Sequence, residues 1–106
     1  MAAKDLRIRV REIKGSCPVY SYNDQFEVEA GFKLVATKAL CLHSLASIMP
    51  YYTALSRGVR ADALGLTKAG TTAYVQCLDP CAFTGGGTVI FEITPFNDKN
   101  AELVKD

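Results

Sequence analysis

The chain has 106 residues and a mass of 11.5 kDa. A chain of this length fits one domain, whose folding buries roughly 60–70% of the surface that the unfolded chain exposes. Hydrophobic residues make up 49% and charged residues 22%, which is typical of a globular domain and not of a disordered chain. Twelve basic and eleven acidic side chains leave a net charge of +1. The sequence therefore offers no overall attraction to phosphate backbones, and we expect no nucleic acid partner.

Nothing in the sequence predicts export or membrane insertion. The first residues are charged and contain no apolar stretch, so no secretory signal is predicted. The most apolar stretch, residues 39–55, contains His43 and Pro50 and is too short and too polar to span a bilayer. We therefore expect a cytoplasmic protein without a membrane partner. In that compartment, cysteines are free thiols, metal ligands or a redox pair rather than a disulfide framework.

Two segments near the amino terminus alternate with the period of a strand. An aliphatic residue alternates with an arginine in residues 6–11, and an apolar residue alternates with Gln or Glu in residues 25–30. This pattern is typical of a strand with one buried face and one solvent face. The acidic face of the second strand is expected to lie across from the basic face of the first.

A helical period begins near Thr37, which is predicted to be the N-cap of an amphipathic helix. The arc predicted to face the core contains Cys41, Leu42, Leu45, Ile48, Met49, Tyr52 and Leu55. His43 projects away from this arc and is expected to be exposed. Pro50 lacks an N–H, so we expect a kink or two stacked short helices, which end at Arg57 and Gly58.

Two further segments, residues 71–77 and 88–93, are rich in β-branched and aromatic residues and predict the closing strands. Residues 78–87 between them are predicted to form a mobile loop. From residue 95 the chain turns polar, so we expect one domain over residues 1–94 and a polar tail over residues 95–106. The fold class is α+β: a small, mainly antiparallel sheet of about four strands packed on one kinked helix.

Four cysteines are the reactive groups that recur in this chain. Cys17 precedes a proline, Cys41 opens the apolar helical stretch, and Cys77 and Cys81 flank a Leu-Asp-Pro segment. Two interpretations stay open for the first three. They are small apolar residues that fill the core, because free cysteine is among the most buried residue types. Alternatively, a turn, a helix start and a strand end bring them together at one edge of the sheet.

If the cysteines meet, three or four thiolates suit a soft metal. Zinc in tetrahedral sulfur coordination and an iron–sulfur cluster are the candidate cofactors, with Cys17, Cys41, Cys77 and Cys81 as ligands. No C-x2-C motif is present, and only Cys77 and Cys81 have a local spacing. A redox pair between these two is a further alternative.

His43 and Asp79 are the other candidate site residues. His43 is a candidate ligand beside Cys41, although residues i and i+2 of a regular helix point apart, and a simple exposed histidine is the alternative. Asp79 precedes Pro80, where an aspartate most often builds a turn, so a reactive carboxylate is the second interpretation. No nucleophile comes with a recognisable base and orienting group, so whether the chain is an enzyme stays open.

Several motifs resemble those of a family of uncharacterised short proteins, about 100 residues long, from mostly anaerobic bacteria and archaea. The motifs are Gly15-Ser16-Cys17-Pro18, Leu40-Cys41-Leu42-His43 and Cys77-Leu78-Asp79-Pro80. The similarity covers roughly residues 5–93 in the same order. The resemblance implies a site shared by Cys17, Cys41 and Cys77, but no settled activity.

Two functional hypotheses follow. The first is a small cytoplasmic binding or accessory module, with a cysteine-ligated metal or iron–sulfur site and a larger partner. The second is a small cysteine-dependent enzyme or redox protein with a pocket near Cys17, Cys41 and Cys77. The candidate assemblies are a complex with a protein partner and a homo-oligomer, because a small sheet covered on one face leaves an edge to protect. Val35, Tyr51 and Phe83 are the residues expected at such contacts.

Overall fold

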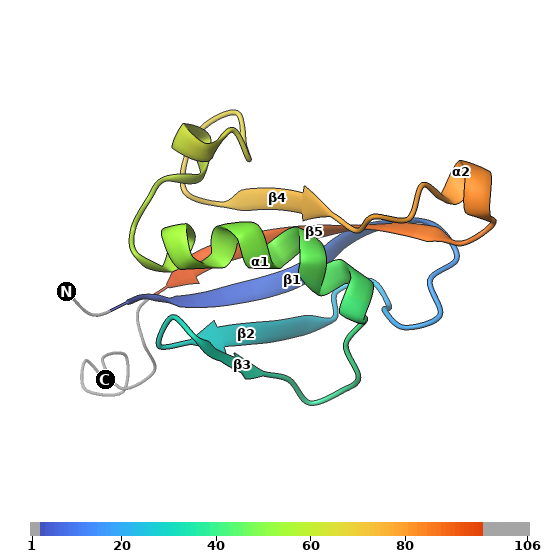
Figure 1. Cartoon of the computed structure of the whole chain (residues 1–106), viewed down its shortest axis with the longest axis horizontal. Coiled ribbons are helices and arrows are strands. Elements are labelled where there is room, and N and C mark those ends of the chain that lie inside the picture. Colours follow the sequence, from blue (N-terminus) through green and yellow to red (C-terminus); the bar gives the residue numbers. More distant parts are fainter. Residues whose placement is uncertain (1–2, 97–106) are drawn as a thin grey trace.

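The computed structural model describes residues 3–96, which form a five-stranded antiparallel sheet crossed on one face by the helix α1, Leu42–Ser56 (Figure 1). The strands are β1 (Asp5–Gly15), β2 (Gln25–Glu29), β3 (Lys33–Val35), β4 (Ala73–Gln76) and β5 (Gly87–Phe96). Their spatial order is β3-β2-β1-β5-β4. A 3₁₀ helix η1 (Ala61–Leu64) and a short helix α2 (Cys81–Thr84) complete the fold. The predicted α+β class is confirmed, and β3 is a strand that the sequence pattern did not reveal.

The alternation in β1 gives the sheet its two faces. Leu6, Ile8 and Val10 are fully buried on the side of α1, and the arginines between them lie on the opposite side. β1 pairs along its whole length with β5, and a bulge after Val10 shifts the register once. The core is therefore one layer between the sheet and α1. Its largest fully buried apolar side chains are those of Phe91, Leu6, Ile8, Leu55, Ile93, Val10 and Val89.

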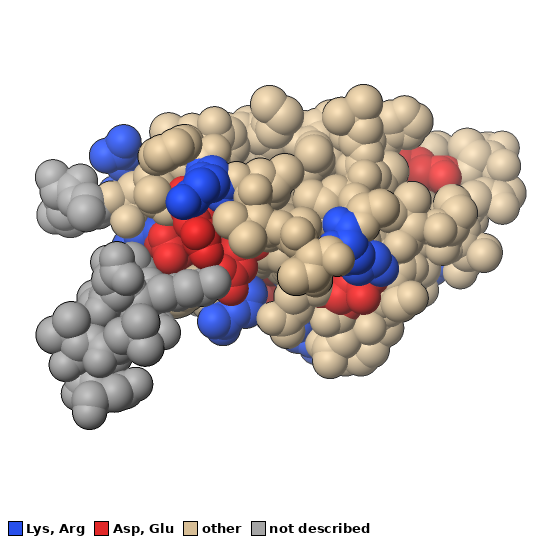
Figure 2. Space-filling view, turned by 90° about the horizontal axis from the view of Figure 1, so that it is seen from below, with Lys and Arg blue, Asp and Glu red and all other residues tan. Residues whose placement is uncertain are grey.

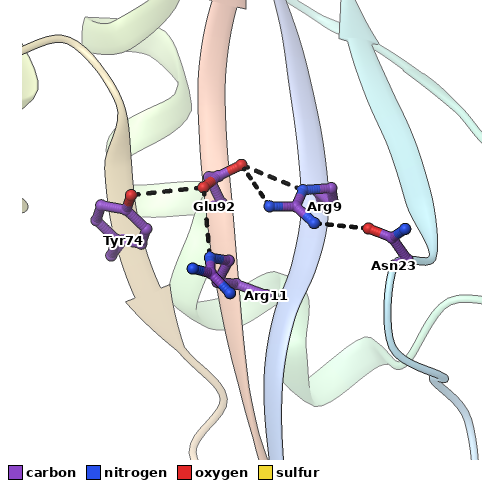
Figure 3. A network of polar contacts seen from close by, with 5 residues as sticks. All are labelled: Arg9, Arg11, Asn23, Tyr74 and Glu92. Carbon is purple, nitrogen blue, oxygen red and sulfur yellow. Dashed lines mark hydrogen bonds and ion pairs between the residues drawn. The ribbon is translucent and has the colours of Figure 1, made fainter.

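The face of the sheet away from α1 carries a network of polar side chains (Figure 3). Arg9 donates to one Glu92 oxygen from Nε at 3.2 Å and from Nη2 at 3.1 Å, and to Asn23 Oδ1 at 2.6 Å. Arg11 Nε lies 3.8 Å from the other Glu92 oxygen, to which the Tyr74 hydroxyl donates at 3.4 Å. The Glu92 carboxylate raises the pKa of Arg9 above its ordinary value. The Glu92 carboxylate of β5 thus pairs with two arginines of β1, Arg9 and Arg11.

Acidic and basic side chains also lie next to each other elsewhere on the surface. Arg7 of β1 lies opposite Glu27 of β2, as the two strand faces predict, and Lys38 pairs with the Asp24 carboxylate. Figure 2, which looks from below onto the side of β2 and β3, shows blue and red groups beside each other with uncharged surface between them. No helix in the described part of the chain has the length and apolar composition needed to cross a bilayer.

The start of α1 differs from the prediction. The helix begins at Leu42 and not near Thr37, and its N-cap is Cys41, which has an extended backbone and no side-chain cap. The helix then runs through Pro50 as one element, so the alternative of two stacked helices is wrong. Local sequence favoured Thr37 because its hydroxyl is a common cap, whereas the group that binds the Cys41 N–H comes from another part of the chain.

The end of α1 follows the prediction. Gly58 has a φ of +90° and its N–H donates to the Leu55 carbonyl at 3.2 Å. The N–H of Val59 donates to the Ala54 carbonyl at 3.0 Å. This pair of bonds is a Schellman motif, in which a left-handed residue directly after the C-cap closes the helix. Glycine reaches that conformation without the steric cost that a side chain would add.

The buried face of α1 is rotated from the predicted arc. Ser44, Ile48 and Leu55 are buried, whereas Leu42 and Met49 from that arc are 77% and 61% exposed. Apolar residues lie on most sides of this helix, so their helical period alone does not identify the face that packs against the sheet. The hydrogen bonds of the Ser44 hydroxyl select it, since they require that residue to face inward.

The segment predicted as a mobile loop, residues 78–87, contains α2, and hydrogen bonds join the two ends of the segment. The Thr84 hydroxyl donates to the Asp79 carboxylate, and the Thr88 hydroxyl donates to the Asp79 carbonyl at 2.5 Å. β5 continues to Phe96, past the expected domain boundary at residue 94. The remainder of the predicted tail, residues 97–106, lies outside the described residues.

Candidate functional site

A cavity of about 160 Å³ lies where the ends of β1, β4 and β5 meet the start of α1. Cys17, Cys41 and Cys77 all line it, together with His43 and Asp79. We call it the cysteine cavity. A dry cavity of about this volume admits a ligand the size of benzene. Of the two interpretations left open for these cysteines, their meeting is therefore found in the structure. Their packing is found as well, because Cys77 belongs to the core and Cys17 and Cys41 pack against it.

Cys17 reaches the cavity directly after β1 ends. Its sulfur accepts the Tyr20 N–H at 3.3 Å, which fixes the turn that Pro18 begins. Gly87, the first residue of β5, runs against this segment: a Cβ at Gly87 would lie 2.7 Å from the Ser16 carbonyl carbon and 2.9 Å from the Cys17 nitrogen. Only a residue without a side chain fits this approach of the two strands.

Cys41 is placed by two buried hydroxyl groups. Its N–H donates to the Tyr20 hydroxyl oxygen at 3.0 Å, and its carbonyl accepts the Ser44 hydroxyl at 2.8 Å. Tyr20 Oη and Ser44 Oγ lie 2.8 Å apart. Since the Ser44 proton goes to Cys41, Tyr20 is the donor between the two hydroxyls. The three residues form a closed ring, in which Tyr20 caps the helix from outside it.

Cys77 lies on the buried side of the cavity and is 8% exposed. Its N–H donates to the Val89 carbonyl at 2.9 Å, and its sulfur accepts the Val89 N–H at 3.2 Å. The thiol itself donates to the Gly87 carbonyl at 3.5 Å. These bonds continue the β4–β5 ladder by one residue, and they hold the Cys77 sulfur in place.

His43 and Asp79, the other candidate site residues, also line the cavity. His43 is exposed, as predicted, and it still shares the cavity with Cys41. This is geometrically allowed because Cys41 precedes the helix in an extended conformation, so the rule for residues i and i+2 of a regular helix does not apply to the pair. Asp79 is half-buried and held by Thr84 and Thr88, which agrees with a role in shaping its loop.

Cys81 is not among the residues that line the cavity. It is the first residue of α2, and its N–H donates to the Thr88 hydroxyl at 3.3 Å. Between residues 3 and 96, no group of three or more His, Cys, Asp or Glu side chains is arranged to hold a metal ion. The geometry thus gives no support to zinc or an iron–sulfur cluster at the four cysteines. All four are free thiols, Cys77 and Cys81 included.

Two residues of the site were missed from the sequence, Tyr20 and Ser44. Tyr20 is 4% exposed; its ring meets Phe91 edge-on at 5.3 Å and stacks on Phe26 at 6.4 Å between centroids. Ser44 is fully buried in a helix whose other buried residues are mostly apolar. A serine on the apolar side of a helical period is a signal for such a buried hydroxyl, whereas no local pattern indicates its partner.

Comparison of the chain with protein-family models, with curated proteins and with solved structures gives no match. The resemblance to the short proteins of anaerobes therefore stays a prediction.

Proposed function

We propose that this protein is a small cytoplasmic binding module and that the cysteine cavity is its ligand site. One observation supports the proposal: Cys17, Cys41 and Cys77, from three distant parts of the chain, line one cavity. Cys77 belongs to the core, and Cys17 and Cys41 pack against it. Protein interiors are close-packed, so core packing alone does not account for a cavity beside all three residues. The unpaired state of all four thiols supports a reducing compartment.

The lining indicates the chemical class of the ligand. Val19, Val89 and the ring of Tyr20 give the cavity apolar walls, and the thiols add polarizable sulfur. His43 and Asp79 add an imidazole and a carboxyl group to the lining. A small, mainly apolar molecule with a soft or electrophilic group fits this combination, because its body is desolvated by the walls while its reactive group contacts sulfur.

Cys41 is the thiol that we assign to contact the ligand. The sulfurs of Cys17 and Cys77 each accept a backbone N–H, and Cys77 is also deeply buried. The sulfur of Cys41 has no hydrogen-bond partner within the described residues, and the residue is half-buried at the start of a 15-residue helix. The positive end of the helix dipole favours an anionic group there.

A second function, a small cysteine-dependent enzyme, is favoured by the presence of Cys41 and His43 in the same cavity. In that case the Cys41 sulfur is the nucleophile and the His43 imidazole takes up its proton. Exposed His43 would then stand at the point where a substrate enters.

Thiol mapping tests the proposal. The native protein is treated with iodoacetamide, and the modified cysteines are identified by mass spectrometry over time. We expect Cys41 to react first and Cys77 last, and we expect the same order in the control variant Cys81→Ser. Phenylmercuric ion, a small apolar probe whose mercury binds one thiolate, should raise the melting temperature of the wild type and of Cys81→Ser but not of Cys41→Ser.

Three results would contradict the proposal. One is a Cys41 thiol that reacts no faster than Cys77. Another is a melting temperature that phenylmercuric ion leaves unchanged. The third is stoichiometric zinc or iron in protein purified anaerobically without chelators, which would make the cysteines metal ligands. A pH-dependent alkylation rate at Cys41 that His43→Gln abolishes would favour the enzyme over the binding module.

A further inference from the structure

β4 is an edge strand with backbone groups that no other strand uses. Its order in the sheet places β5 on one side only. Tyr74 donates its N–H away from β5, to the Leu66 carbonyl at 2.9 Å, whereas Cys77 donates toward β5, to Val89. In an antiparallel pair these directions alternate along the strand. The N–H and carbonyl of Gln76 therefore lie on the open edge, as does the carbonyl of Tyr74.

A groove of about 580 Å³ runs between this edge and α1. One wall is formed by residues of the first half of the helix and just beyond, from Ala46 to Tyr51, and the other by Tyr74 and Gln76 of β4. None of the residues that line the groove is charged. The Ser47 hydroxyl oxygen, which belongs to the helix wall, is buried and has no hydrogen-bond partner in the described part of the chain. Buried polar atoms in native proteins nearly always have a hydrogen-bond partner, and a polar group that enters the groove can supply one to this oxygen.

We propose that the β4 edge and this groove bind an extended segment of a partner protein, which joins the sheet as an added strand. The backbone of the segment pairs with the free groups of Tyr74 and Gln76, and every second side chain enters the groove. Those side chains are apolar and uncharged, to match the groove. The side chains between them are polar, because on the other face of the sheet they come next to Tyr74, whose hydroxyl donates to the Glu92 carboxylate of β5 (Figure 3).

A second copy of this chain fits the edge less well than a partner segment does. Antiparallel pairing of two β4 strands joins two grooves and brings no new side chain into them, because Val75, which faces α1, is already part of its own core. Such a dimer would enclose a hollow, and tightly packed interfaces do not contain one. The opposite edge of the sheet, β3, is only three residues long and begins with the charged Lys33, which is a common protection against added strands.

The experiment uses an acetylated and amidated heptapeptide of alternating threonine and valine as the probe, added to the ¹⁵N-labelled full chain. Backbone amide shifts are followed during the titration. We expect saturable shifts at residues 46–51 and 74–78. A peptide with the same sequence but N-methylated at alternate residues should not bind, because it cannot pair with a strand.

Two pairs of variants locate the site. Gln76→Pro removes the outward N–H of the edge without breaking a bond to β5, and Gln76→Thr is its control. Ala46→Glu puts a charge on the exposed helix wall, and Thr53→Glu is its control outside the groove. Gln76→Pro loses one backbone hydrogen bond and Ala46→Glu loses an apolar contact, so each should weaken the affinity for the probe peptide by about tenfold. Both controls should keep wild-type affinity.

Absence of saturable binding below about 1 mM would overturn the proposal, as would shifts confined to another surface or equal binding of the N-methylated peptide. Sedimentation provides the remaining test. A dimer that Gln76→Pro dissociates would show that a second copy occupies the edge, which also overturns the proposal. None of these outcomes depends on the thiols of the cysteine cavity.

Discussion

Replacing Tyr20 with phenylalanine tests the ring that places Cys41. The substitution keeps the aromatic packing on Phe26 and Phe91 and removes only the hydroxyl. Two hydrogen bonds are lost, one to Ser44 at 2.8 Å and one from the Cys41 N–H at 3.0 Å. A hydrogen bond contributes about 0.5–1.5 kcal/mol, and a buried donor left unpaired costs about 1–3 kcal/mol. We therefore expect the free energy of unfolding to fall by about 2–3 kcal/mol.

Urea unfolding followed by circular dichroism measures this difference, and the melting temperature should fall by about 10–20 °C for a domain of this size. Tyr51→Phe is the control, because the Tyr51 hydroxyl has no hydrogen-bond partner in the described residues; its cost should stay below about 0.5 kcal/mol. The variants Ser44→Ala and Tyr20→Phe should couple by about 0.5–1.5 kcal/mol in a double-mutant cycle. In Tyr20→Phe, the freed helix start should also let iodoacetamide reach Cys41 faster than in the wild type.

Equal stability losses in Tyr20→Phe and Tyr51→Phe would refute this reasoning. An additive result for Tyr20 and Ser44 would do so as well, since it would mean that the two hydroxyls act independently.

Three further predictions concern the core, the strand contact and the pH dependence. Leu55→Ala should cost about 2–5 kcal/mol in urea unfolding, because Leu55 is fully buried, whereas Leu42→Ala on the exposed side should cost under about 1 kcal/mol. Gly87→Ala should cost about 1–3 kcal/mol by crowding the backbone that follows β1, and its Cys17 should react faster with iodoacetamide. The Arg60 guanidinium lowers the pKa of Asp62 from 3.8 to about 2. This depressed pKa stabilises the fold above about pH 4 and the effect is lost as pH falls toward 2, so the difference in melting temperature between the wild type and Asp62→Asn should shrink over that window. A difference that stays constant from pH 6 to 2 would contradict it.

The strands β1 and β2 could be predicted because burial of one face leaves a period of two in the sequence. β4 and β5 could be predicted because their segments are rich in β-branched and aromatic residues. β3 could not, since Lys33, Leu34 and Val35 are all exposed and no alternation develops over three residues. Its strand geometry comes from pairing with β2, where Leu34 lies opposite Val28. Pairing of this kind is a property of two segments together, and neither segment shows it alone.

The start of α1 was missed for a related reason. Thr37 has the side chain of a good cap, but capping within the chain requires the helix to begin directly after it. The Cys41 N–H is instead bound by Tyr20, a residue 21 positions earlier in the chain. A cap supplied from that distance is fixed by the tertiary fold, and the local sequence at Cys41 contains no sign of it.

The candidate site shows what spacing can and cannot predict. A proline after Cys17, a helix start at Cys41 and a strand end at Cys77 favoured one edge of the sheet for all three residues as one of two interpretations, with core packing as the other. Cys81 was assigned to the same group because it follows Cys77 closely, yet it opens α2 and lies beside Gly15 of β1 instead. Metal binding requires ligand sulfurs that point toward the ion and do not merely lie close to it. The Cys17 sulfur is oriented by the hydrogen bond that it accepts from the Tyr20 N–H, and the Cys77 sulfur by the one that it accepts from the Val89 N–H. Because those bonds leave Cys41 as the one cavity cysteine whose sulfur has no hydrogen-bond partner among residues 3–96, a ligand that needs one thiol suits this cavity better than an ion that needs four.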